Sequence, residues 1–150
     1  MEKKQKIWLV ILIGWIMVIF GHSMAPSDRS SAESSFVLYT VQECFDVVGV
    51  SGTWLTETII RKMAHFAEYT GMGFFLYQNF RYLKTDRITK ILAGGLTVLA
   101  VPFIDETIQL FAEGRASMIQ DVWLDLSGAF TGLAAAALLE LVFRRMRRRN

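Results

Sequence analysis

Four stretches of this 150-residue chain are long and apolar enough to cross a lipid bilayer, and they limit the fold more than any other feature. A helix needs about 20 residues to cross the hydrocarbon core, and the stretches lie at about 7–22, 59–82, 88–111 and 118–143. Hydrophobic residues make up 53% of the chain, which is unusual for a soluble domain. We therefore predict one all-α domain over residues 1–150, an integral membrane four-helix bundle.

Local signals support these helices. Thr56 is a plausible N-cap for the second helix, and Gly114 is suited to a turn after the third. Lysines before the first helix resemble the start of a secretory signal. However, Pro26 lies where a cleavage site needs small residues, so we predict an uncleaved first helix.

Basic residues predict the orientation, because Lys and Arg in short loops remain cytoplasmic. They concentrate at the amino terminus, around 81–90 and in the tail 144–149. The connection over about residues 23–58 is acidic instead. We therefore predict a multi-pass protein of the cytoplasmic (plasma) membrane with both termini inside. The basic tail is interpreted as an anchor on anionic lipid, and no nucleic-acid partner is expected.

The first outer loop contains a weaker helix signal. Ser30 and Glu33 form a capping-box pattern, and a stripe including Val37, Val41 and Cys44 follows before Gly49. This predicts an amphipathic helix on the outer surface, and a loop without regular structure is the alternative.

Ionisable residues inside the apolar stretches point to a functional site. A charge near the bilayer centre costs about 3 kcal/mol or more unless it is paired or hydrated. Counting at about 1.5 Å per residue from the cytoplasmic basic residues places His65, Asp105 and Asp125 at a similar depth in the outer leaflet. Three helices are thus predicted to direct polar side chains towards one place.

Three motifs in this region carry a family resemblance. They are Arg61-Lys62-Met63-Ala64-His65-Phe66-Ala67-Glu68-Tyr69, then Asp105-Glu106-Thr107-Ile108-Gln109-Leu110-Phe111, and Gly114-Arg115-Ala116-Ser117 leading into Asp121-Val122 and Gly128. With Ser23 after the first helix, they make nearly the whole chain resemble the VanZ-like family of small membrane proteins. The resemblance implies a link to teicoplanin and lipoglycopeptide resistance for some members. The predicted ligand-binding residues are Arg61, Lys62, His65, Glu68, Asp105, Glu106, Gln109, Arg115, Ser117, Asp121 and Asp125.

Three interpretations of this cluster remain open. They are, in order of preference, structural ion pairing, a site for an anionic or zwitterionic headgroup, and a metal site to which His65 and Glu68 contribute. We predict no metal and no other cofactor. Five carboxylates nevertheless face only three basic side chains, and our hypothesis is a proton shared between carboxylates, rather than a protonated His65 or a bound cation.

The function predicted from these features is binding of an envelope lipid or a lipid-linked cell-wall precursor, which lowers lipoglycopeptide susceptibility. The alternatives are a membrane enzyme that modifies such a lipid and a proton-coupled carrier. Candidate catalytic groups are His65, Glu68 and Glu106, but the spacing of His65 and Ser117 does not establish a base and nucleophile. Enzyme activity is therefore left open, with binding alone preferred.

The pair Gly128 and Gly132 forms a small-xxx-small pattern in the fourth helix. Such a pattern allows two helices to approach closely. We expect this approach within the chain, and an oligomer through the same glycines is the alternative.

Overall fold

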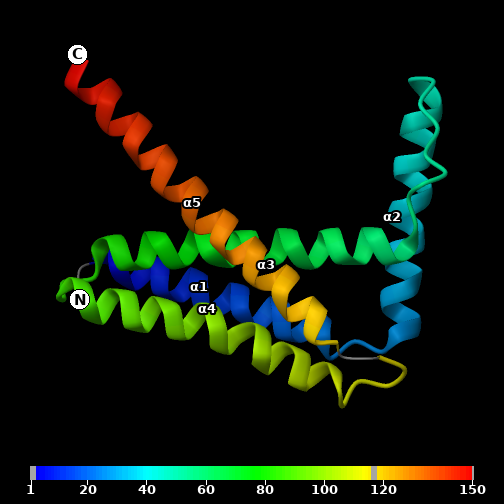
Figure 1. Cartoon of the computed structure of the whole chain (residues 1–150), viewed down its shortest axis with the longest axis horizontal. Helices are drawn as coiled ribbons and strands as arrows, with labels where there is room; N and C mark the ends of the chain where they lie inside the picture. The colour runs from blue at the N-terminus through cyan, green and yellow to red at the C-terminus, as the bar shows by residue number, and fades with distance from the viewer. Residues whose placement is uncertain (1–2, 116–117, 150) are drawn as a thin grey trace.

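The structure is a computed structural model that describes residues 3–115 and 118–149. Within these ranges it contains five α-helices and no strand (Figure 1). The helices are α1 (Lys3–Ser23), α2 (Ser27–Val47), α3 (Glu57–Tyr82), α4 (Arg87–Gln109) and α5 (Ile119–Arg149). The all-α prediction is confirmed. The predicted end of the last helix at Phe143 is wrong, because α5 continues through the basic tail, whose Arg144 pairs with Glu140 one turn earlier.

Polar side chains begin the helices where the sequence allows it. The Thr56 hydroxyl accepts a hydrogen bond from the Ile59 amide at 3.3 Å, which confirms the predicted N-cap of α3. Asp86 does the same for α4, accepting from the Thr89 amide at 2.7 Å. Gly114 adopts a φ of 71°, a left-handed conformation that favours glycine, in the turn between α4 and α5.

Helix α3 is the centre of the bundle, in contact with all four other helices. Its Tyr69, Met72 and Leu76 are buried in a core completed by α1, α4 and α5. Helices α1, α4 and α5 are long and apolar enough to cross a membrane, whereas α3 is long enough but not apolar enough to qualify by composition. A fourth crossing by α3 therefore stays a prediction.

Helix α5 crosses α3 obliquely and in very close contact (Figure 1). A Cβ atom on Gly132 would lie 1.9 Å from the Thr70 carbonyl oxygen, and one on Gly128 would lie 2.6 Å from the Phe66 carbonyl oxygen. Gly73 of α3 faces the Ala129 carbonyl in the same way. These glycines serve the contact within the chain that we expected. An oligomer through Gly128 and Gly132 stays a prediction.

The outer loop forms a helix, α2, that runs across the start of α3 and packs against it, while its far half extends away from the bundle (Figure 1). The predicted capping box is wrong, because α2 begins at Ser27, directly after Pro26. The Ser30 amide bonds the Pro26 carbonyl, and Glu33 pairs with Arg29 at 3.1 Å instead of capping. Pro26 fixes its own φ near the helical value, so α2 can begin at Ser27, before Ser30 of the predicted capping box.

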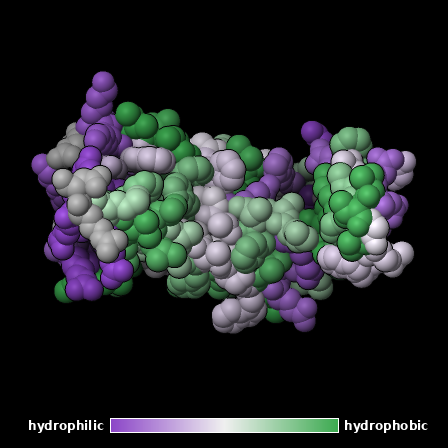
Figure 2. All heavy atoms as spheres, turned by 90° about the horizontal axis from the view of Figure 1, so that it is seen from above, coloured by the Kyte–Doolittle hydropathy of each residue, from purple (hydrophilic) through white to green (hydrophobic). Residues whose placement is uncertain are grey.

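The surface has the pattern of a membrane protein. Large apolar side chains are exposed along α1, α4 and α5, an arrangement that water does not tolerate over so wide an area. Figure 2 shows apolar residues over the middle of the molecule, a dense group of hydrophilic residues at one end and scattered hydrophilic residues towards the other. The start of α1, the end of α3 and the start of α4 meet at this end (Figure 1). The basic residues that predict a cytoplasmic side are thereby brought together.

Candidate functional site

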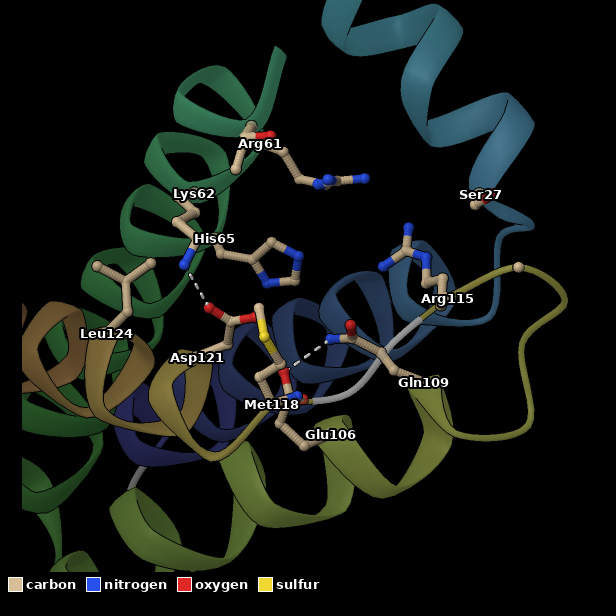
Figure 3. Close-up of a pocket in the computed structure, with 12 residues that line it drawn as sticks. Ser27, Arg61, Lys62, His65, Glu106, Gln109, Arg115, Met118, Asp121 and Leu124 are labelled. Carbon is tan, nitrogen blue, oxygen red and sulfur yellow. Dashed lines mark hydrogen bonds and ion pairs between the residues drawn. The ribbon is translucent and has the colours of Figure 1, made fainter. Parts of the chain in front are cut away.

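A polar cavity of about 230 Å³ lies at the opposite end of the bundle, where α3 and α5 begin and α4 ends (Figure 3). Its wall includes seven of the residues predicted from sequence: Arg61, Lys62, His65, Glu106, Gln109, Arg115 and Asp121. The remaining lining residues are Ser27, Thr58, Gly114, Met118 and Leu124.

Two arginines from different segments point into this cavity (Figure 3). The Arg115 guanidinium donates to the His22 carbonyl oxygen at 3.1 Å. Among residues 3–115 and 118–149, Arg61 makes no ion pair. Burial, and then the positive charge of Arg61, lower the pKa of Arg115. Arginine still remains charged at neutral pH, so the cavity holds a positive charge that attracts anions.

The opposite wall is acidic, and each of its carboxylates is held by neighbours. Lys62 Nζ lies 2.8 Å from Asp121 Oδ1. Glu106 accepts hydrogen bonds from the Met118 amide and from Gln109 Nε2, both at 3.1 Å. These contacts neutralise or fix the acidic wall, which leaves the arginines as the groups available to a ligand.

The Gln109 side chain also reaches below the cavity, where Nε2 donates to Asp105 Oδ2 at 3.3 Å. Asp105 of α4 and Asp125 of α5 are fully buried there beside His65 of α3. The three side chains offer nitrogen or oxygen atoms within 4.8 Å of one another, a geometry that suits a metal ion. The predicted convergence of three helices is therefore confirmed, whereas the roles of the residues stay predictions.

Glu68 faces a second cavity, of about 210 Å³, between α1, α2 and α3. It forms an ion pair with His22, and Arg61, His65 and Arg115 line both cavities. Glu68 is thus separated from the acidic wall with which it was grouped. Ser117, also among the predicted ligand-binding residues, lies outside the described residues.

The VanZ/LLP1 family model matches residues 8–140. The chain belongs to the VanZ/LLP1 family. No curated protein and no solved structure shows a significant similarity to this chain. The matched segment of the VanZ/LLP1 chain contains every predicted site residue, and it confirms the resemblance carried by the three motifs.

Sequence reasoning did not identify several residues of this VanZ/LLP1 site. His22 at the end of α1 contacts Glu68 through its ring and Arg115 through its carbonyl. Ser27 lines the cavity, and its amide bonds the Glu113 carbonyl at 3.0 Å. One signal was present for His22, because it and His65 are the two histidines of the chain and both lie near the outer ends of predicted helices.

Proposed function

We propose that this VanZ/LLP1 protein is a multi-pass protein of the plasma membrane. Its cavity binds the anionic headgroup of an envelope lipid or a lipid-linked cell-wall precursor. The observation that carries the proposal is the position of Arg61 and Arg115, two cations from separate segments that point into one cavity. Like charges repel, so this arrangement favours an anion between them.

The membrane position follows from the distribution of charge. The cavity lies at the end of the bundle away from the basic residues (Figure 1). If those residues are cytoplasmic, then the cavity opens towards the outer leaflet. Three apolar helices supply the spanning segments, and α3 is proposed as the fourth.

The size of the cavity favours a headgroup rather than a whole lipid. Sites for drug-sized molecules occupy about 300–1,000 Å³, whereas this cavity measures about 230 Å³. A phosphate or pyrophosphate group fits that space while its acyl or prenyl chains remain in the bilayer. Guanidinium groups bind phosphate oxygens through paired N–H donors, which suits Arg61 and Arg115 to this role.

Lys62 contributes less than the arginines in this proposal, because Asp121 already pairs with it. Gln109 and Glu106 orient the wall of the cavity through their hydrogen bonds. By resemblance to resistance-associated members of the family, the proposed consequence is a lower susceptibility to teicoplanin and related lipoglycopeptides.

Mass spectrometry of lipids that copurify with the protein tests this function. We expect a defined anionic lipid with the wild type that is lost from Arg61→Ala and Arg115→Ala. Arg29→Ala is the matched control, since Arg29 is an exposed arginine on α2 that does not line the cavity. Equal lipid retention and teicoplanin susceptibility in wild type and Arg61→Ala, at equal expression, would refute the proposal.

A membrane enzyme is the second candidate, favoured by one observation. His65 lines the cavity, and its Nδ1 lies 3.9 Å from Asp125 Oδ1, so a small rotation would let the carboxylate orient His65 as a base. An enzyme would change the total envelope lipids of cells that carry the gene, and His65→Ala would abolish the change. A binding protein would leave the chemical composition of those lipids unaltered.

A further inference from the structure

The cluster of His65, Asp105 and Asp125 extends from the cavity wall, where His65 lies, to two buried carboxylates that the proposed headgroup site does not use. Each residue comes from a different helix, and the two carboxylates have no solvent exposure. Burial of an ionised carboxylate is costly unless a cation, a proton or several hydrogen bonds compensate it.

Among the described residues, hydrogen bonds only partly compensate the burial of these two carboxylates. Both oxygens of Asp125, and Oδ1 of Asp105, lack a hydrogen-bond partner there. The hydroxyls of Ser23 and Tyr69 are fully buried beside Asp105 and interact with its carboxylate, although neither contact has the geometry of a normal hydrogen bond. Buried polar atoms are usually hydrogen-bonded, so unpartnered carboxylate oxygens of Asp105 and Asp125 around one point favour a bound cation.

The polar side chains around the cluster are directed elsewhere, and Arg61 and Arg115 point into the cavity. Lys62 pairs with Asp121, and His22 pairs with Glu68. In the part of the chain that the structure describes, neither Lys nor Arg forms an ion pair with Asp105 or Asp125. Two adjacent buried carboxylates therefore carry a formal charge of about −2, which one divalent cation would balance.

We propose that His65, Asp105 and Asp125 bind one divalent transition-metal ion of the Zn²⁺ or Mn²⁺ type. One imidazole nitrogen with carboxylate oxygens suits these ions, whereas Mg²⁺ and Ca²⁺ prefer oxygen ligands alone. Two ligand atoms at about 2.1 Å from one ion are at most about 4.2 Å apart. The observed separations reach 4.8 Å at most, so small side-chain rotations complete the site.

Gln109 supports this site from outside. Its Nε2 holds Asp105 Oδ2 at 3.3 Å and thereby orients the carboxylate, as hydrogen bonds to metal ligands commonly do. The metal site goes beyond the headgroup site and does not depend on it, because Arg61 and Arg115 are not ligands.

Metal analysis of the purified full-length protein tests the proposal. After incubation with Zn²⁺ or Mn²⁺ and dialysis, we expect about one ion per wild-type chain and less than about a tenth of an ion in Asp125→Asn or Asp105→Asn. Glu33→Gln, which removes an exposed carboxylate, should retain the ion. Arg61→Ala should also retain it, so that failure of the lipid proposal and failure of the metal proposal are separable.

A spectroscopic measurement on the wild type avoids variants that fail to fold. Bound Mn²⁺ should show nitrogen coupling in electron spin echo experiments, and His65→Gln should remove it. A folded wild-type protein that binds no added Zn²⁺ or Mn²⁺ would overturn the proposal in favour of a proton shared by the two carboxylates. Retention of the ion by both Asp→Asn variants, or bound Mn²⁺ without nitrogen coupling, would overturn it too.

Discussion

Lys62 of α3 and Asp121 of α5 form an ion pair of 2.8 Å on the wall of the cavity. Both side chains are partly exposed, so the pair contributes less than about 1 kcal/mol to stability. Its main effect is to occupy one of the three basic groups that the sequence assigned to ligand binding.

Lys62→Ala should therefore weaken lipid retention less than Arg61→Ala. A hydrogen bond to a charged group contributes about 1.5–3 kcal/mol, so loss of Arg61 should reduce affinity about tenfold or more. Loss of Lys62 should reduce affinity by less than about threefold. The comparison is made by titrating the lipid that copurifies with the wild type into each delipidated variant. Equal losses in the two variants would show that Lys62 leaves Asp121 to contact the ligand.

Gly132→Ala should strongly destabilise the contact between α3 and α5. The new Cβ would lie 1.9 Å from the Thr70 carbonyl oxygen, so one helix must move. Overpacking of this kind costs about 1–3 kcal/mol or more. Gly95→Ala is the matched control, because nothing lies within 4 Å of its Cβ position. Thermal unfolding in detergent measures both, and a similar midpoint for the two variants would contradict the close crossing.

Trp15→Phe should loosen the attachment of α1 to α3. The Trp15 indole Nε1 donates to the Glu68 carbonyl oxygen at 2.7 Å, and phenylalanine cannot replace this bond. The expected loss is about 1 kcal/mol. Trp123→Phe serves as control, because Trp123 is exposed on α5. Mixed-micelle unfolding should separate the two variants, and equal stabilities would count against the bond.

Cys44 should react with a membrane-impermeant maleimide on intact cells. It is the single cysteine of the chain and is exposed on α2, at the end of the molecule opposite the basic residues. A Cys44→Ser, Thr85→Cys variant moves the thiol to the loop between α3 and α4, and should react only after permeabilisation. Labelling of Thr85→Cys on intact cells, with Cys44 labelled only after permeabilisation, would show that the proposed topology is inverted.

Asp86 should give the start of α4 a pH-dependent stability. Hydrogen bonds from the Thr89 hydroxyl and the Thr89 amide lower the pKa of Asp86. A depressed pKa contributes stability that is present above the unfolded value of 3.8 and is lost as the pH falls through the folded value. Amide protection at Thr89 should decrease with acid in the wild type and change little in Asp86→Asn, which caps without titrating. Equal pH dependence in both would exclude Asp86 as the cause.

The sequence predicts the helices and the meeting point of their polar faces well. The length of each apolar stretch determines where a helix can extend, and the spacing of His65 from the basic end determines its depth. Asp105 and Asp125 follow from the same count, which explains why three residues far apart in sequence were correctly placed together.

The pairing of side chains between helices is not predictable in this way. His22 and Glu68 are 46 residues apart, and the choice of Glu68 over other carboxylates depends on how α1 packs on α3. The partners of Glu140 on α3 could not be predicted from the sequence either. It accepts from Tyr77 at 2.7 Å and lies 3.5 Å from Arg81, whereas the local i, i+4 pattern points to Arg144. Helix periodicity predicts which residues share one face of a helix, but the packing of the helices determines which neighbouring residues that face contacts.

The close crossing of α3 and α5 also has a consequence for biosynthesis. His65 emerges from the ribosome well before Asp121 and Asp125, and α4 separates them in the chain. The cavity wall and the buried cluster therefore cannot exist until α5 has been translated and has docked on α3. Until then Lys62 and His65 of α3 lack their partners Asp121 and Asp125 from α5, so α3 enters the membrane with its charged face unpaired.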